Sequence, residues 1–380
     1  MIRAFQKAGI SESHFSGSTG YGYGDRGRDA LDEVYAFCFD AEDALVRHSF
    51  ASGTHALTVA LFGVLRPKDT ILSVTGVPYD TIKGVIGIDS SYPGSLKDFL
   101  VNYKEIPLKY DGQVNLNAVA KNVTDDVKMV YVQRSRGYSL RPSLTCKEIS
   151  EIVKTVRSKS SSAVIMLDNC YAEFVEALEP LSVGADLIAG SLIKNPGGGI
   201  AQSGGYIAGK KDLVQMCAYR LTTPGTGKDI GATFNHNREL FMGAFHGPHA
   251  AGEALKTAVF AASLFERLGF EVSPKFNDER SDIIQTIKLK NEEQLIKFCR
   301  GIQCGSAVDS FVVPEPSDMP GYECKVIMAA GTFTLGSSIE LSADAPLRPP
   351  FAVWLQGGLN FHSGKLGIML AANKLMGTFI

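Results

Sequence analysis

The sequence predicts an α/β fold, with a large, mainly parallel sheet followed by a smaller α+β domain. The first observation is an alternation of short apolar runs with helical segments from about residue 45 onward, which is typical of βαβ units. The second is a change of pattern after Gly269, where strand-like runs outnumber clear helices. The third is the length of 380 residues, which favours about two domains.

Apolar spacing defines the elements of the large domain. Segment 52–65 is the clearest helix, because Ala56, Val59, Ala60 and Val64 fall on one face. Further helices are expected at 116–122 and 145–159. Short apolar runs predict strands at 71–74, 127–132, 164–167, 187–189 and 205–208.

The rest of the chain divides into a connecting helix, a small domain and an arm. A long helix is expected over 238–268, interrupted around Gly247-Pro248 and stopped by Gly269. The elements expected beyond it are strands at 284–289, 326–330 and 352–355 and helices at 292–304 and 362–376. Residues 1–30 are rich in Gly, Ser, Tyr and Arg, which is typical of an extended arm. We therefore expect an arm over 1–30, a large domain over 31–265 and a small domain over 266–380.

The composition argues against several kinds of partner. Lys and Arg number 38 against 40 Asp and Glu, so the net charge of −2 gives no electrostatic basis for binding nucleic acid or an anionic membrane. The seven cysteines include no C-x-x-C pair, which argues against a disulfide framework or a structural zinc site. Since there is no signal-peptide pattern and no apolar stretch long enough to span a bilayer, we expect a cytoplasmic protein without a metal site.

The ends of two successive strands carry the strongest chemical signal. Asp168 ends one apolar run, and Ser191 and Lys194 end the next. A lysine amine can form a Schiff base with pyridoxal phosphate, and a carboxylate can keep the pyridine nitrogen protonated, so that the ring accepts electrons from a carbanion. Asp168 and Lys194 in this order therefore predict a pyridoxal phosphate site. A surface lysine beside a flexible glycine loop is the alternative for Lys194.

The phosphate and the ring of such a cofactor need further contacts. Ser52, Gly53 and Thr54 open the expected helix 52–65, where backbone N–H groups can bind an anion. Ser191 is close enough in sequence to Lys194 to donate to the same phosphate. Tyr79 follows the expected strand 71–74, so its ring could lie flat on a pyridine ring. An ordinary helix cap at Ser52 and a tyrosine that only packs are the alternatives.

Three arginines are candidates for binding a substrate carboxylate through a bidentate fork. Arg134 and Arg136 follow the expected strand 127–132, and Arg348 lies in a proline-rich segment ahead of the last strand. A surface salt bridge is the alternative for Arg134 and Arg136.

The arm combines phenol and guanidinium groups at Tyr23, Arg26 and Arg28. We expect it to cross to a second subunit and complete an anion site there, so that a homodimer is the minimal active unit. A loop that packs on its own subunit is the alternative.

Together these motifs resemble the pyridoxal-phosphate enzymes of fold type I, the aspartate aminotransferase fold. Within that fold the chain is similar to the methionine gamma-lyase-like or aluminium-resistance proteins, which are related to the cystathionine lyases. The resemblance covers nearly the whole chain. It rests on Gly20-Tyr21-Gly22-Tyr23, Ser52-Gly53-Thr54-His55, Gln133–Tyr138, Asp168-Asn169-Cys170-Tyr171, Ser191–Gly199, Arg348-Pro349-Pro350 and Gln356-Gly357-Gly358.

The resemblance also implies roles for the candidate residues. Lys194 would carry the cofactor as an internal aldimine, Asp168 would partner the pyridine nitrogen, and Tyr79 would stack on the ring. The implied phosphate ligands are Ser52, Gly53, Thr54 and Ser191, with Tyr23 and either Arg26 or Arg28 from the neighbouring subunit of a homodimer or homotetramer.

The implied reaction is α,β- or α,γ-elimination from a sulfur-containing L-amino acid, releasing a keto acid, ammonia and a thiol. The freed Lys194 amine would remove the α-proton, for which burial near the cationic ring should lower its pKa. An aminotransferase or another amino-acid lyase is the alternative within the fold. A non-catalytic cofactor-binding regulator is the alternative from another class, and Lys194, Asp168 and a substrate arginine argue against it. A metal-tolerance protein is disfavoured because the sequence has no metal-ligand spacing.

Overall fold

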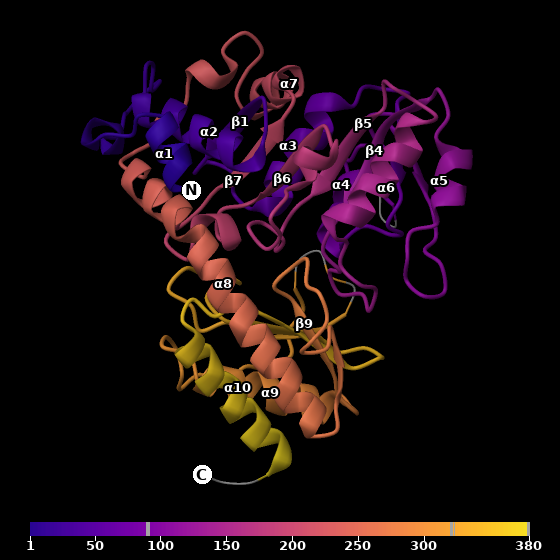
Figure 1. Ribbon diagram of the computed structural model, residues 1–380, viewed down its shortest axis with the longest axis vertical. Helices are drawn as coiled ribbons and strands as arrows, with labels where there is room; N and C mark the ends of the chain where they lie inside the picture. The colour runs from indigo at the N-terminus through magenta and orange to yellow at the C-terminus, as the bar shows by residue number, and fades with distance from the viewer. Residues whose placement is uncertain (89–91, 320–321, 323, 378–380) are drawn as a thin grey trace.

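The computed structural model describes residues 1–88, 92–319, 322 and 324–377. A large domain and a small domain are joined by one long helix, α8 (Figure 1). The large domain is built on a seven-stranded sheet of order β1-β7-β6-β5-β4-β2-β3, in which β7 runs antiparallel to the other strands. The strands are β1 (Asp43–Arg47), β2 (Thr70–Ser73), β3 (Asn102–Glu105), β4 (Val127–Gln133), β5 (Val164–Asp168), β6 (Leu187–Ser191) and β7 (Gly205–Gly209).

Helices cover both faces of this sheet, which is why its central strands are nearly continuous apolar runs. Every residue of β5 and β6 is buried. One face packs on α2 (Arg26–Phe39), α5 (Leu116–Asn122) and α6 (Cys146–Arg157). The other face packs on α3 (Gly53–Val64), α4 (Asp80–Ile86) and α7 (Lys211–Leu221). The predicted α/β fold with a mainly parallel large sheet is confirmed.

Because β2, β4, β5 and β6 are parallel, their carboxyl ends meet at one edge of the sheet, where ligands bind in open α/β folds. The register sets Gln133 at the end of β4 beside Asp168 at the end of β5. Asp168 in turn lies beside Ala189 on β6, two residues before Ser191. Strand pairing thus brings the candidate residues to one place.

Helix α8 (Asn237–Arg267) is continuous, so the expected interruption at Gly247-Pro248 is wrong. A Cβ on Gly243 would lie 2.4 Å from the carbonyl oxygen of Gly197, and one on Gly247 would lie 3.0 Å from that of Asn195. The glycines therefore let the 3₁₀ turn η3 (Asn195–Gly197) pack directly on the helix. The two glycines are therefore explained by close packing against the loop after Lys194, and they do not interrupt the helix.

The small domain contains a five-stranded antiparallel sheet of order β10-β11-β12-β9-β8. Its strands are β8 (Glu271–Ser273), β9 (Gln285–Lys288), β10 (Val326–Ala329), β11 (Ser342–Pro346) and β12 (Ala352–Gln356). Helices α9 (Glu292–Cys304) and α10 (Phe361–Met376) share its apolar core with the C-terminal half of α8. β11 alternates small and polar residues and carries no apolar-run signal, yet it lies inside the sheet between β10 and the central strand β12.

The N-terminal residues do not form an extended arm. They are folded and packed on the large domain. They fold into α1 (Ile2–Lys7) and the 3₁₀ turn η1 (Glu12–Phe15) ahead of α2. Phe5 and Phe15 pack edge-on against Phe241 at the start of α8, with ring centroids 5.8 and 5.7 Å away. Ala4 is buried in the same core, and Met1, Ala8 and Ile10 also pack against it, so apolar residues scattered through this segment anchor it to the large domain.

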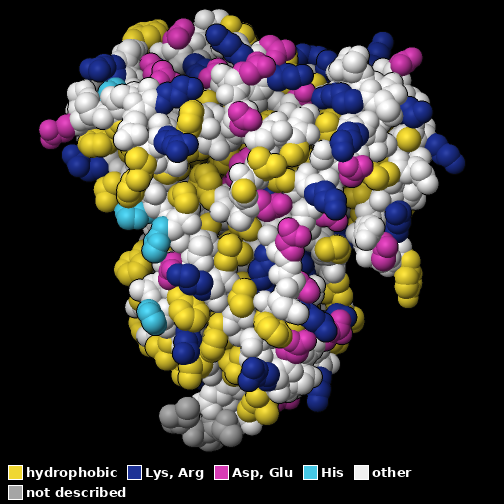
Figure 2. Space-filling model, in the orientation of Figure 1, with side chains coloured by type: hydrophobic (Ala, Val, Ile, Leu, Met, Phe, Trp, Pro, Cys, Tyr) yellow, Lys and Arg dark blue, Asp and Glu magenta, His cyan; other side chains and the backbone are white. Residues whose placement is uncertain are grey.

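The surface shows no single-sign field on the face displayed in Figure 2, where basic and acidic side chains are intermixed. Among the described residues, no helix is long and apolar enough to cross a membrane.

Candidate active site

The predicted lysine and aspartate lie together at the carboxyl edge of the large sheet. Asp168 is the last residue of β5, and Lys194 follows the end of β6 immediately before η3. Lys194 Nζ lies 3.8 Å from the centroid of the Tyr171 ring. Tyr171 has a left-handed backbone conformation, with φ of +73°, which is uncommon for a bulky residue and is often found at functional sites.

The electrostatics of Lys194 differ from the expected lowering of its pKa. Burial lowers the pKa of the amine, but electrostatic interactions with the facing Cys170, Tyr171 and Asp168 side chains raise it by more, so the pKa lies above its ordinary value. Burial also raises the pKa of Tyr171 to about 12 and that of Cys170 well above its usual range. The Asp168 carboxylate therefore acts electrostatically on the Lys194 amine.

The start of α3 and the end of β6 form one cradle. A Cβ added to Gly53 would lie 3.1 Å from Cβ of Ser191 and 3.4 Å from Sγ of Cys170. Glycine thus keeps the space between the helix N-terminus and Ser191 open. The first N–H groups of a helix lack intrahelical partners and favour anions. Ser52 Oγ caps the helix by accepting from the N–H of His55 (3.1 Å), and Thr54 Oγ1 bonds to Thr81 Oγ1 (2.8 Å).

This donor set fits pyridoxal phosphate. An open, glycine-lined helix N-terminus is suited to the phosphate, a lysine amine to the aldehyde, and a carboxylate to a protonated ring nitrogen. Ser52, Gly53, Thr54, Ser191, Asp168 and Lys194 are the residues that would hold it.

Tyr79 lies beyond the end of β2, as the N-cap residue of α4. Its N–H donates to Gln133 Oε1 (2.8 Å), and its hydroxyl bonds to the hydroxyl of Tyr322 (2.7 Å). Burial, reinforced by Tyr322, raises the pKa of Tyr79 well above its ordinary value, so the phenol is neutral. Its ring packs edge-on against Tyr138, with centroids 5.4 Å apart.

Arg134 is committed to a buried network rather than to an open site. Its side chain is fully buried and forms ion pairs with Glu176 (2.6 Å) and Glu179 (3.3 Å). It also donates to Oδ1 of Asn169, the residue after Asp168 (2.8 Å). Both terminal nitrogens of the guanidinium group thus bind other residues of the protein. A structural role therefore explains Arg134 better than the expected contact with substrate.

Arg136 joins the two domains. Its Nη1 donates to the carbonyl oxygen of Ser273 (3.0 Å) and to Thr286 Oγ1 (3.2 Å), on β8 and β9 of the small domain. It is buried, and burial lowers the pKa of its guanidinium group. The side chain thus stabilises the domain junction.

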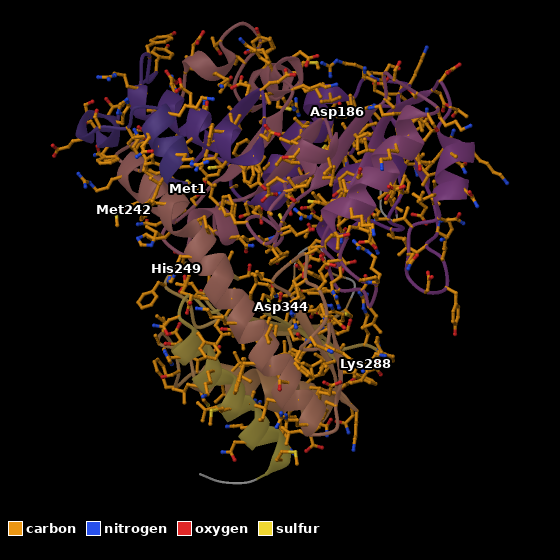
Figure 3. The ribbon with its side chains drawn as sticks, in the orientation of Figure 1. Met1, Asp186, Met242, His249, Lys288 and Asp344 are labelled. Carbon is orange, nitrogen blue, oxygen red and sulfur yellow. The ribbon has the colours of Figure 1, made fainter. Side chains whose placement is uncertain are left out.

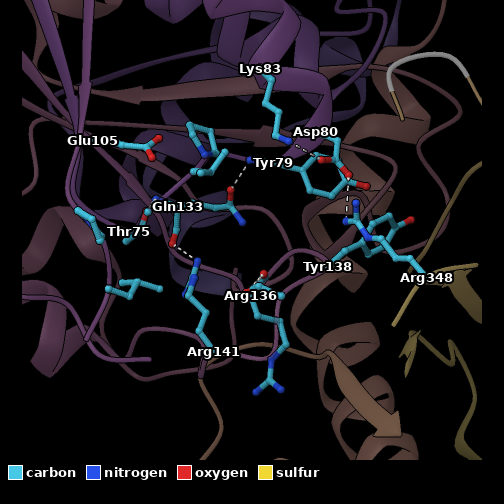
Figure 4. A pocket seen from close by; sticks show the side chains of 16 residues that line it. Thr75, Tyr79, Asp80, Lys83, Glu105, Gln133, Arg136, Tyr138, Arg141 and Arg348 are labelled. Carbon is cyan, nitrogen blue, oxygen red and sulfur yellow. Dashed lines mark hydrogen bonds and ion pairs between the residues drawn. The ribbon is translucent and has the colours of Figure 1, made fainter. Parts of the chain in front are cut away.

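Arg348 is the most exposed of the three predicted substrate arginines. It lines a cavity of about 440 Å³ beyond the ends of β2 and β4, together with Tyr79, Tyr138 and Lys83. Figure 4 shows its guanidinium group directed toward Asp80, at an N–O distance of 3.8 Å. Asp80 also pairs with Lys83 (3.4 Å). Arg136 also lines this cavity, but Arg348 is the more exposed of the two and is therefore the better candidate to meet a small molecule there.

The N-terminal candidates differ from one another in exposure. Tyr23 and Arg26 are exposed on the surface. Arg28 is buried, and its guanidinium group donates to the carbonyl oxygens of Gly22 (2.8 Å) and Gly231 (3.1 Å) in its own chain. Arg26 is consequently the arginine of this segment that a second subunit could meet.

Several side chains around Lys194 were not singled out from the sequence. Tyr171, Tyr138, Tyr322, Glu173 and Asp344 lie around the candidate site. Glu173 is fully buried, accepts from the Tyr206 hydroxyl (2.9 Å), and has a pKa raised to about 8 by burial. The position of Tyr171, three residues after Asp168, was an available signal. Asp344 comes from the distant β11 and had no local signal.

In the described part of the chain, no group of three His, Cys, Asp or Glu residues is arranged to hold a metal ion.

Comparison with known proteins agrees with this geometry. The methionine gamma-lyase family model matches residues 1–376. A carbon-sulfur lyase involved in aluminium resistance from Clostridium novyi is 52% identical, with a TM-score of 0.94 over 98% of this chain and 88% of that one. A candidate cystathionine beta-lyase involved in aluminium resistance from Clostridium acetobutylicum is 53% identical, with a TM-score of 0.95 and the same coverage.

A curated relative, the uncharacterized protein YnbB of Bacillus subtilis, is 47% identical over 377 residues, which is 99% of this chain and 90% of that protein. The fold is that of the fold type I pyridoxal-phosphate enzymes. Because the family model spans nearly the whole sequence, the chain belongs to the methionine gamma-lyase family.

Proposed function

We propose that this chain is a pyridoxal-phosphate-dependent carbon–sulfur lyase that acts on a sulfur-containing L-amino acid by α,β- or α,γ-elimination. The observation that carries the proposal is the placement of Lys194 within electrostatic reach of Asp168, beside the Gly53–Ser191 cradle at the carboxyl edge of the large sheet. Membership of a family of carbon–sulfur lyases supports the reaction class.

The position of each candidate residue suggests its role in cofactor binding or catalysis. When bound, pyridoxal phosphate supplies an electron sink for negative charge at the substrate α-carbon. Lys194 would attach the cofactor, and its amine would then move the proton at the α-carbon. Asp168 would hold positive charge at the ring nitrogen. Ser52, Gly53, Thr54 and Ser191 would bind the phosphate, and Tyr79 would cover the ring.

The raised pKa of Lys194 bears on this role. The amine can accept a proton only when it is itself neutral. The influence of Asp168, which raises the pKa of the amine, must therefore be compensated during catalysis. Positive charge at the ring nitrogen, next to Asp168, would provide that compensation. Arg348, at the cavity shared with Tyr79, is the proposed partner for the substrate α-carboxylate.

The test of this function is a panel of L-cystathionine, L-cysteine, L-methionine and L-homocysteine incubated with the purified protein and pyridoxal phosphate. We expect a keto acid and a thiol to form in equal amounts without any added keto acid. Turnover that requires an added keto acid would identify an aminotransferase instead. Binding of the cofactor without turnover of any amino acid would favour a regulatory protein.

We also propose that the active unit is at least a homodimer in which Tyr23 and Arg26 complete the phosphate site of the partner. Their exposure supports this, because their own chain does not cover them. Loss of one guanidinium–phosphate contact should weaken cofactor binding about ten- to a hundredfold.

Subunit mixing tests the shared site. Inactive Lys194→Ala subunits are mixed with inactive subunits that carry Tyr23→Phe and Arg26→Ala. If the sites are shared, each mixed dimer has one site with both defects and one with none, so activity should return to about a quarter of the wild-type value on random mixing. Mixed dimers that form and remain inactive would assign the two residues to their own subunit.

A further inference from the structure

Three arginines gather around one shared carboxylate at the domain junction. Arg136 and Arg141 follow β4 in the large domain, and Arg280 lies ahead of β9, the strand that ends at Lys288 in the small domain (Figure 3). Arg136 and Arg141 are buried, and Arg280 is partly buried. Burial lowers the pKa of all three guanidinium groups, and Asp282 is the carboxylate that acts on each of them. The cluster is therefore richer in positive than in negative charge.

Two of these guanidinium groups bind the same pair of strands. Ser273 of β8 and Thr286 of β9 are opposite each other in the sheet, and Arg136 donates to both. Arg280 Nη2 donates to Oε1 of Gln285, the residue before Thr286 (2.6 Å). The positive charge of Arg136 in turn lowers the pKa of Arg280. The two groups are thus neighbours, although they come from different domains.

Several donors of this pair of arginines lack a partner. Within the described residues, Arg136 Nε and both Nε and Nη1 of Arg280 are buried without a hydrogen-bond partner. A guanidinium group has no acceptor atom, and buried donors are usually paired because an unpaired one is costly. These nitrogens are shielded from bulk water, so solvent does not compensate them. The partner that fits them is an acceptor, and a negatively charged acceptor also fits the surplus of positive charge.

The carboxylates around the cluster do not close this charge balance. In the described part of the chain, none of the three arginines forms an ion pair. Asp282 accepts instead from the Ser143 hydroxyl and from the N–H of Ile284. Buried cations without a close counter-charge are strongly unfavourable, so an additional anion would stabilise the junction. The remaining carboxylates that act on the cluster reach one arginine each: Asp168 and Glu148 act on Arg141, and Asp278 acts on Arg280.

Cavities border the cluster on two sides. Arg136 and Arg141 line the cavity of about 440 Å³ that is drawn in Figure 4. Arg280 lines a second cavity, of about 700 Å³, together with Lys147 of α6. A small ion can therefore approach the cluster from either cavity. The unpaired donors themselves are enclosed by protein, which favours a small spherical ion over a phosphate or an organic acid.

We propose that Arg136 and Arg280 form a binding site for a halide-sized anion at the junction of the two domains, with chloride as the ligand. The anion accepts hydrogen bonds from both domains and so stabilises their contact. Arg141 adds positive charge to the site, and Asp282 limits its affinity. The site is separate from Lys194 and does not depend on the proposed lyase function.

Chloride binding is measured from the width of the chloride NMR signal, with wild-type protein that is saturated with pyridoxal phosphate and dialysed into sodium gluconate. We expect a saturable broadening that bromide reverses. Arg280→Gln removes the charge and most of the donors, so chloride binding should weaken about ten- to a hundredfold. Arg300→Gln, the same change at a partly exposed arginine of α9, should bind chloride as the wild type does. Broadening that Arg280→Gln leaves unchanged would overturn the proposal.

Asp282→Asn provides a test of opposite sign, which also applies if Arg280→Gln does not fold. The change removes the carboxylate that acts on all three arginines, while the amide oxygen can still accept from the N–H of Ile284. Chloride should then bind roughly tenfold more tightly, because less of the positive charge is compensated within the protein. A purely structural cluster would gain no affinity for chloride, so unchanged or weaker binding in this variant would contradict the proposal.

Thermal unfolding and diffraction connect the binding to this position. At equal ionic strength and well above the Kd, chloride in place of gluconate should raise the unfolding midpoint of the wild type by about 2–4 °C and leave that of Arg280→Gln unchanged. In crystals transferred to sodium bromide, anomalous scattering should place a bromide ion between Arg136 and Arg280. Bromide at adventitious surface positions only, with equal midpoints in the two salts, would show that the cluster binds no anion and would refute the proposal.

Discussion

Lys194→Ala is expected to reduce turnover by at least about three orders of magnitude, because the substitution removes both the attachment point of the cofactor and the amine that moves the α-proton. In the wild-type protein, borohydride reduction should fix the cofactor to Lys194, and mass spectrometry of the digested protein should find the modified peptide. The same treatment of Lys194→Ala should leave the chain unmodified.

Stability separates this loss from a folding defect. Lys194 interacts electrostatically with Asp168, so its removal leaves the carboxylate with less compensation, and thermal unfolding should be measured alongside activity. Lys154→Ala, at an exposed lysine of α6, serves as the control and should retain full activity and modification. A reduced adduct on another lysine in the wild-type protein would refute the assignment of Lys194.

The sequence was informative wherever function and strand pattern coincide. The apolar runs that lead to Asp168 and Ser191 had to be strands buried on both faces, and parallel pairing then brought their ends together. The fold, the large parallel sheet and the site at its edge followed from this. Strands β1 and β3 were missed, because β1 is a short edge strand that begins with an acidic residue and β3 is mostly exposed and polar.

Features that depend on distant partners could not be predicted from local sequence. Arg134 and Arg136 have the composition of an anion site, but the groups that bind them are Glu176 and Glu179 in one case and Ser273 and Thr286 in the other. A guanidinium group has the same local signal whether its partner is a substrate or a glutamate. The partners are supplied by the fold.

Asp344 is a residue near the candidate site that local sequence did not reveal. It lies in a strand without an apolar run, and its neighbours in sequence are alanines. The antiparallel pairing of β11 with β12 sets Asp344 opposite Trp354, and the fold brings its carboxylate within electrostatic reach of Lys194. Long-range juxtaposition of this kind is visible only in the structure.

Asp168→Asn should preserve the fold and remove most of the activity. Asp168 Oδ1 accepts from the N–H of Cys170 (3.1 Å), and the amide oxygen of asparagine can keep this bond. The change therefore removes charge with little effect on shape. A neutral amide cannot stabilise a protonated pyridine nitrogen, so we expect turnover to fall on the order of a hundred- to a thousandfold, as when one member of a buried charge pair is lost.

The pKa of Lys194 gives a second measurement for this variant. Asp168 is one of the groups that raise the pKa of the Lys194 amine, so in the cofactor-free protein the pKa should fall when Asp168 becomes asparagine. Chemical labelling of Lys194 by an amine-reactive reagent should accordingly begin at lower pH in the variant than in the wild type, since only the neutral amine reacts. Asp309→Asn, the same change at an exposed position of the small domain, should change neither labelling nor turnover. An Asp168→Asn protein with activity within a few-fold of wild type and an unshifted labelling profile would show that Asp168 partners neither the ring nitrogen nor Lys194, and the electron sink would then require a different residue at the end of β4 or β5.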